Sequence, residues 1–224
     1  MERGIQTADV KKAYAVWVLL VLNLLIFFIL EAVGDTEDGY FMYRHGAMLT
    51  GAITEDGEYW RLFTAMFLHF GPEHVFNNML VLFAIGTILE NGIGHGRLAA
   101  IYLISGLGAN LTSHLLNVQA GDEVLSAGAS GAVFGLMGAM IFAGAFARDL
   151  IGSLSLRQII VMLVLSLYHG VSEGVDDAAH VSGLIYGFLL AFLLLKLWPP
   201  KKASVYLPQA FPDDEATWGS DYRY

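Results

Sequence analysis

Of the 224 residues in the chain, 56% are hydrophobic and only 15% are charged, whereas about 25% of residues in an ordinary soluble protein are charged. The 12 basic and 21 acidic residues give a net charge of −9, which argues against nucleic acid as a partner. The absence of cysteine excludes disulfides, thiolate metal sites and a cysteine nucleophile. Because the charges gather in short clusters between long uncharged runs, the sequence predicts an all-α membrane protein.

Six stretches lack acidic and basic residues over a length comparable to the roughly 20 residues that a spanning helix needs. They are residues 13–30, 74–89, 98–121, 124–147, 158–172 and 178–195. The second and fifth are short, which a tilted helix or one buried in a bundle tolerates. The first follows two lysines, as a signal peptide would, but its apolar run is long and no small-residue cleavage site follows. We therefore interpret it as a retained helix.

The distribution of basic residues predicts the orientation of these helices. If the N-terminus is cytoplasmic, ten of the 12 Lys and Arg residues lie inside, and only Arg44 and Arg61 lie outside. This bias requires an even number of spans, so we expect a six-helix bundle with both termini cytoplasmic. The expected domain covers residues 13–197, between a tail over 1–12 and a disordered tail over 198–224. The short tails favour a prokaryotic plasma membrane.

The longest connection, residues 31–73, lies on the outer side between the first two helices and is rich in aromatic residues. Aromatic patches with scattered charges predict short helices in the membrane interface. Within this loop, Trp60 and Arg61 are most simply an interfacial anchor pair. Glu90, at the inner end of the second helix, is expected to fix helix ends by hydrogen bonding.

Three of the predicted helices carry polar residues at their outer ends, where such side chains are costly unless they pair or line a cavity. His74 and Asn78 lie early in the second helix, Ser126 and Ser130 in the fourth, and His180 opens the sixth. All three helices run inward from the outer face in the expected topology. The sequence therefore predicts that serine, histidine and asparagine side chains from distant segments meet at one depth.

Ser130 is a weak candidate by itself, because a serine in a membrane helix usually bonds to its own backbone. Its neighbourhood makes it stronger, since small residues recur four apart on both the fourth and the sixth helix. These residues are Gly131, Gly135, Ala179, Gly183 and Gly187. If the two helices pack through these faces, the ring of His180 reaches Ser130 and can act as the base that its hydroxyl needs.

His74 and Asn78 share a helical face because they are four residues apart. They either donate hydrogen bonds to a developing oxyanion or satisfy backbone groups of the neighbouring loop, and periodicity does not separate these alternatives. Together with His114, His169 and His180, His74 also raises the question of a metal site. No His-Glu-x-x-His pattern and no carboxylate at mid-span supports one, so we expect neither metal nor cofactor.

In this order and on six helices, these residues resemble the motifs of the rhomboid family of intramembrane serine proteases, over roughly residues 14–197. The matching positions are Trp60 and Arg61; His69, His74 and Asn78; Gly128, Ala129, Ser130 and Gly131; and Ala179, His180, Gly183 and Gly187. The resemblance implies that Ser130 is the nucleophile and His180 its general base, without an acidic third member.

The resemblance further implies that His74, Asn78 and the backbone amide of Ser130 form the oxyanion hole. Phe134 stands where some relatives carry a tyrosine stacked on the histidine, and Glu90 matches a buried glutamate with a structural role. The implied reaction is hydrolysis of a transmembrane segment near the outer membrane face, at a site with helix-weakening residues. The fifth helix and the loop 171–177 would form a movable gate.

Two other classes of protein are weighed against a protease. A rhomboid-like protein that binds or escorts membrane proteins without cutting them typically lacks the serine or the histidine, and this chain has both. A six-helix transporter is not supported by any buried charge pair or internal repeat. The expected partners are therefore transmembrane protein substrates and the lipid bilayer. The physiological substrate, the oligomeric state and the roles of His114 and His169 are left open.

Overall fold

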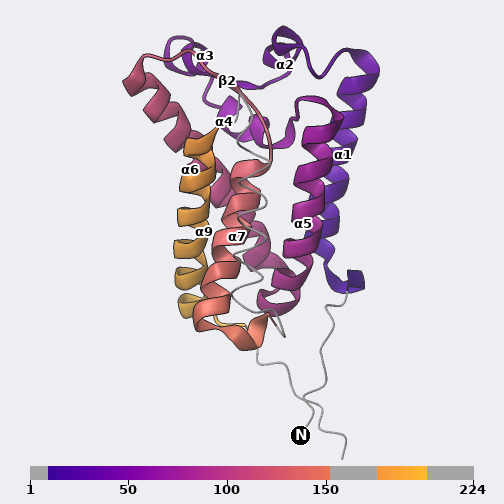
Figure 1. The fold of residues 1–224 in the computed structure, drawn as a ribbon, viewed down its shortest axis with the longest axis vertical. Helices are drawn as coiled ribbons and strands as arrows, with labels where there is room; N and C mark the ends of the chain where they lie inside the picture. The colour runs from indigo at the N-terminus through magenta and orange to yellow at the C-terminus, as the bar shows by residue number, and fades with distance from the viewer. Residues whose placement is uncertain (1–9, 152–175, 201–224) are drawn as a thin grey trace, which may run out of the picture.

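Long helices run side by side along the main axis of the molecule, and short elements gather at one end of them (Figure 1). The computed structural model describes residues 10–151 and 176–200. The described elements are η1 (Val10–Lys12), α1 (Tyr14–Val33), α2 (Gly39–Arg44), β1 (Met48–Leu49), α3 (Thr50–Thr54), α4 (Arg61–Thr64), η2 (Ala65–Phe67), α5 (Gly71–Ile93), α6 (His95–Ala120), β2 (Leu125–Ser126), α7 (Ser130–Phe146), η3 (Arg148–Leu150) and α9 (Asp177–Leu197).

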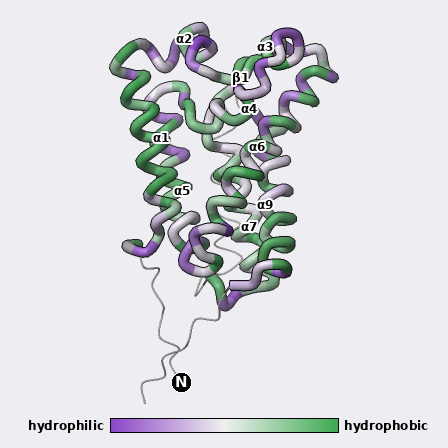
Figure 2. Tube along the Cα trace, turned by 180° about the vertical axis from the view of Figure 1, so that it is seen from behind, coloured by the Kyte–Doolittle hydropathy of each residue, from purple (hydrophilic) through white to green (hydrophobic). Residues whose placement is uncertain are grey.

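Four of the described helices are long and apolar enough to cross a membrane, namely α1, α5, α6 and α9. α7 is a shorter apolar helix of 17 residues. Hydrophobic residues cover the helices along their length, whereas hydrophilic residues concentrate at their ends and in the short elements at one end of the bundle (Figure 2). These five helices correspond to five of the six predicted spans. The predicted fifth span, residues 158–172, lies outside the described residues, as do residues 1–9 and 201–224 of the predicted tails.

The prediction for the fourth helix is wrong at its beginning, because α7 starts at Ser130 and not near residue 124. Residues Leu125–Ser126 form β2, which pairs antiparallel with β1, so that Met48 faces Ser126 and Leu49 faces Leu125. Gly128 then adopts a φ of 151°, a backbone conformation that only glycine adopts without strain. Ser126 is therefore a strand residue, and the helix begins at the candidate nucleophile itself.

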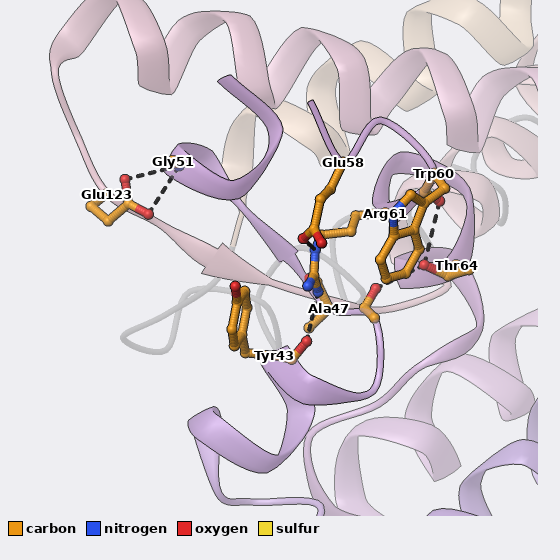
Figure 3. A network of polar contacts seen from close by, with 9 residues as sticks. Tyr43, Ala47, Gly51, Glu58, Trp60, Arg61, Thr64 and Glu123 are labelled. Carbon is orange, nitrogen blue, oxygen red and sulfur yellow. Dashed lines mark hydrogen bonds and ion pairs between the residues drawn. The ribbon is translucent and has the colours of Figure 1, made fainter. Parts of the chain in front are cut away.

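Arg61 holds the elements between α1 and α5 together (Figure 3). Its guanidinium is almost fully buried and donates to the carbonyl oxygens of Tyr43 and Ala47, at 2.6 and 2.9 Å, and to the carboxylate of Glu58. It also lies over the rings of Tyr43 and Trp60. Trp60 is half exposed, as an interfacial anchor would be, but Arg61 is an internal cross-link of the loop.

The helix α7 lies at the centre of the bundle and packs against α5, α6 and α9. Its contact with α9 is made by backbone atoms: a methyl group added to Gly183 would lie 2.2 Å from the carbonyl oxygen of Gly131. A methyl group added to Gly187 would lie 1.8 Å from the carbonyl oxygen of Gly135. The two helices therefore pack through the small-residue faces, as the spacing of the glycines predicts.

α1 lies against α5 at the other side of the bundle (Figure 1). The buried carboxylate of Glu90, near the end of α5, accepts hydrogen bonds from the backbone amides of Ala15 and Val16, both at 2.8 Å. It also pairs with the ring of His95. Glu90 therefore satisfies orphan amides of the first turn of α1, and the prediction that it fixes a helix end is confirmed.

Candidate functional site

Ser130 is the first residue of α7, which begins at the end of the bundle that carries the short elements (Figure 1). Two hydrogen bonds hold the turn in front of it. The amide of Gly128 donates to the carbonyl of Ala65 at 2.9 Å, and the amide of Ala129 donates to Nε2 of His69 at 3.3 Å. Because the amides of the first helical turn have no partner within the helix, the backbone at Ser130 is suited to bind an anion.

The ring of His74 lies close to this turn. A methyl group added to Gly128 would lie 2.9 Å from Cε1 and 3.0 Å from Nε2 of His74, and 3.6 Å from the hydroxyl oxygen of Ser130. The imidazole of His74 and the hydroxyl of Ser130 therefore both lie close to Gly128, and a side chain at this position would collide with the imidazole. The predicted neighbourhood of the second and fourth helices is thus present, with α5 supplying His74 and α7 supplying Ser130.

His180, in the first turn of α9, stacks on Phe134 of α7. The ring centroids are 4.3 Å apart and the planes meet at 13°. Phe134 is four residues after Ser130, so both lie on one face of α7. The buried imidazole of His180 therefore lies against the face of α7 that begins at Ser130. The stacking partner proposed from the resemblance, a phenyl ring in place of a phenol, occupies this position.

Asn78 lies one turn along α5 from His74 and is also buried. Its side-chain amide donates to the carbonyl oxygen of His74 at 3.0 Å. Of the two alternatives considered for Asn78, this contact matches the one in which the side chain bonds to a backbone group. The carbonyl it binds belongs to its own helix, however, and not to a neighbouring loop. It uses one of the two N–H groups of the amide and leaves the other for a second acceptor.

His69 acts on the site through the backbone. It lies just before α5, not inside a helix, and is buried with its ring 5.2 Å from that of His74. Burial, and the neighbouring imidazole of His74, lower the pKa of His69 from 6.5 to about 3. Neutral His69 can therefore accept the hydrogen bond from Ala129 that holds the turn before Ser130. Its place in the sequence motif did not indicate this role.

Asp176 is a residue near the site that the sequence analysis did not single out. It caps the N-terminus of α9, four residues before His180, and its side chain accepts a hydrogen bond from the amide of Ala179. An aspartate just before an apolar helix is a sequence pattern for such a cap. The last two residues of the predicted gate loop 171–177 thus belong to the start of α9, and the rest lies outside the described residues.

The other candidates do not join this group of side chains. Among residues 10–151 and 176–200, no three His, Asp or Glu side chains are arranged to hold a metal ion. His114 is buried in α6, near Asn110, whose amide donates to the carbonyl of Leu62. His169 lies outside the described residues.

A hydroxyl at a helix start, two buried or half-buried imidazoles and a side-chain amide thus converge from α5, α7 and α9. A serine hydroxyl becomes a nucleophile when an imidazole takes its proton, and amide and imidazole N–H groups stabilise an oxyanion. In the part of the chain that the structure describes, no carboxylate is hydrogen-bonded to the ring of His180, and this set of side chains is compatible with a Ser–His dyad.

Comparison with known proteins gives the family. The family model for the rhomboid domain matches residues 56–197. Rhomboid protease GluP of Bacillus subtilis is 34% identical over 179 residues, which cover 80% of this chain and 34% of that protein. RHOMBOID-like protein 5 of Arabidopsis thaliana is 41% identical over 151 residues, covering 64% of this chain and 46% of that protein. RHOMBOID-like protein 1 of the same plant is 41% identical over 161 residues, covering 68% and 39%.

The chain spans between about a third and a half of the length of these curated relatives. The matched region contains all the residues that form the candidate site and three of the four helices able to span a membrane, namely α5, α6 and α9. Since the family model matches more than half of the chain, the protein belongs to the rhomboid family of multi-pass integral membrane proteins.

Proposed function

We propose that the protein is an intramembrane serine endopeptidase that cleaves transmembrane segments of membrane proteins near the outer membrane face. The observation that carries the proposal is the stacking of His180 on Phe134, one helical turn from Ser130. It is supported by the glycine contacts between α7 and α9, which bring the backbones of the two helices directly against each other. The named rhomboid proteases among its relatives support the same class of activity.

In the proposed reaction, the hydroxyl oxygen of Ser130 attacks the carbonyl carbon of the scissile peptide bond while His180 takes the hydroxyl proton. The tetrahedral intermediate collapses when the C–N bond breaks and His180 returns this proton to the leaving amine. An acyl-enzyme ester on Ser130 remains. Water attacks the ester while His180 takes one of its protons; the C–O bond to Ser130 then breaks, and His180 returns the proton to the Ser130 oxygen as the acid product leaves.

The oxyanion formed in both steps needs donors that are in place before the reaction. The backbone amide of Ser130, the ring of His74 and the unused N–H of Asn78 are the proposed donors. The short distance between His74 and Gly128 supports this arrangement, because the ring borders the turn that carries the amide. The hydrogen bond from Asn78 to the carbonyl of His74 would hold the Asn78 amide in its orientation.

The proposed topology has six membrane helices over residues 13–197, with both termini cytoplasmic and the elements between α1 and α5 in the outer interface. The uneven distribution of basic residues supports this orientation. The fifth helix, with the loop up to residue 175, would form the gate for substrates. The expected substrates are single-pass segments with helix-weakening residues near the outer face, because an extended backbone is needed at the nucleophile. A prokaryotic plasma membrane is the proposed location.

A cleavage assay on the full chain tests the proposal. Purified protein, in detergent or in liposomes, is mixed with a single-pass model substrate, and the products are identified by mass spectrometry. Ser130→Ala and His180→Ala should each lower the cleavage rate by about 1,000-fold or more. Ser182→Ala is the matched control, since its hydroxyl donates to the carbonyl of Ala178 in its own helix, and its rate should stay close to that of the wild type.

Retained cleavage in both Ser130→Ala and His180→Ala would refute the dyad. If the wild-type protein binds the substrate without cutting it under any condition tested, the escort function is favoured over the protease.

A further inference from the structure

The carboxylate of Asp176 holds the start of α9, because one of its oxygens accepts a hydrogen bond from α9 and the other accepts one from α6. Oδ1 accepts from the amide of Ala179 at 2.9 Å, and Oδ2 accepts from the hydroxyl of Ser113 on α6 at 2.5 Å. The carbonyl of the same residue accepts from the amide of His180 at 3.1 Å. One residue thus caps the helix, begins its hydrogen-bond ladder and ties it to α6.

The tie continues into α6. The side-chain amide of Asn117 donates to the hydroxyl oxygen of Ser113 at 3.4 Å, one helical turn further along. Ser113 is fully buried and Asp176 is half-buried, so this connection lies at the packed contact between α6 and α9. The position at which α9 begins is therefore fixed from α6, independently of the glycine contacts with α7.

The first turn of a helix is its least constrained part, because its amides lack partners within the helix. His180 lies in this turn. Without a cap the turn can fray, and the imidazole would then move relative to the ring of Phe134 on which it stacks. The stacking fixes the plane of the ring from the side of α7, whereas the cap fixes the backbone from which the ring projects.

We propose that Asp176 is a positioning residue for His180, acting with Ser113 by holding the first turn of α9 in place. This inference rests on the proposed function, because it assigns His180 the role of the base. Asp176 acts through the backbone of Ala179 and His180 and does not take part in proton transfer. Its effect should therefore fall on the rate of the chemical step and not on substrate binding.

Four variants separate this role from an effect of charge. Asp176→Ala removes the cap and the tie to α6. Asp176→Asn removes the charge, but its side-chain oxygen still accepts from Ala179 and its amide can donate to Ser113. Asp177→Ala, the control, removes the same charge from an exposed position one residue further on. Ser113→Ala keeps the cap and removes the tie to α6.

The measurement is kcat and KM for a single-pass model substrate in liposomes, at a temperature where each variant is folded. Asp176→Ala should lower kcat by about 10-fold or more with KM within about 2-fold, since a small misplacement of a reacting group is enough for such a loss. Asp176→Asn should recover most of this loss, Asp177→Ala should match the wild type, and Ser113→Ala should lose about 3-fold in kcat.

Equal kcat in Asp176→Ala and Asp177→Ala would overturn the inference, as would a loss in Asp176→Asn as large as that in Asp176→Ala. If Asp176→Ala does not fold, Ser113→Ala decides alone, and an unchanged kcat refutes the positioning role. Ser130→Ala, measured in parallel, keeps the two claims distinct. If Ser130→Ala still cleaves, the proposed function fails; if only the Asp176 comparison fails, the dyad stands without this positioning residue.

Discussion

The contact between α7 and α9 and the contact between α1 and α5 are built in different ways. Between α7 and α9, glycines bring backbone atoms together, and a carbon added to Gly183 or Gly187 would meet a carbonyl oxygen of α7. Between α1 and α5, a methyl group on Gly86 would meet side chains and not backbone, namely Val16 at 2.8 Å and Leu82 at 3.4 Å. There the specific link is the carboxylate of Glu90.

The difference suggests that the contact between α7 and α9 sets the geometry of the candidate site, whereas the contact between α1 and α5 contributes to stability. The pair α7 and α9 carries Ser130 and His180, so its close backbone contact determines the relative position of the two side chains. The pair α1 and α5 carries a buried hydrogen-bonded carboxylate whose removal leaves unpaired amides. An alteration of the first contact should therefore reduce activity, and an alteration of the second should reduce stability.

The largest effect is expected for Gly187→Ala. The new methyl group would lie 1.8 Å from the carbonyl oxygen of Gly135, so the helices must move apart. Because a displacement of about 1 Å can cost a reaction 100-fold, we expect the cleavage rate to fall by about 100-fold or more. Gly86→Ala is the matched control, and its rate should stay within about 3-fold of the wild type. Similar rates in the two variants would contradict the comparison.

The second prediction concerns stability at the other contact. Glu90→Ala leaves the amides of Ala15 and Val16 without their buried acceptor, which should lower the free energy of unfolding by about 2–5 kcal/mol. Glu90→Gln keeps one acceptor oxygen and should lose less. Unfolding in mixed detergent measures this change, while the cleavage rate per folded molecule should remain near that of the wild type. A variant that keeps its stability but loses its activity would contradict the assignment.

Near neutral pH, the smallest effect is expected where the two regions meet, at His69. Its folded-state pKa of about 3 lies below the ordinary 6.5, so the folded protein binds this proton more weakly than the unfolded chain. The stabilisation is complete above pH 6.5 and is lost progressively as the pH falls from 6.5 towards about 3. His69→Gln cannot titrate, so its unfolding free energy should fall less steeply with acid. Equal slopes in both proteins would show that His69 does not control the acid response.

Apolar runs and small-residue spacing were sufficient to predict much of the bundle. The runs located the helices because a spanning helix must be uncharged over most of its length. The four-residue spacing of Gly183 and Gly187 predicted the contact with α7, since only small residues permit it. The stacking partner Phe134 and the structural role of Glu90 also lie where the resemblance to rhomboid proteases places them.

The beginning of α7 could not be predicted from the same signals. Residues 124–129 are as uncharged as the helix that follows, so hydropathy does not show that Leu125 and Ser126 pair with a strand more than 70 residues earlier. The internal role of Arg61 was missed for a related reason: two of its partners are backbone carbonyls, which leave no mark in the sequence. The cap by Asp176 left a local pattern, but its bond to Ser113 depends on the packing of α6 and α9.

Covalent labelling tests the central claim, that the contact between α7 and α9 brings His180 to Ser130 as its base. A serine-reactive fluorophosphonate or isocoumarin probe is reacted with the full chain in detergent, and the modified residue is identified by peptide mass spectrometry. The account predicts labelling at Ser130 in the wild type and in Gly86→Ala, and its near-complete loss in His180→Ala and Gly187→Ala. Labelling of Ser130 at the wild-type rate in His180→Ala, or labelling at another serine only, would contradict it.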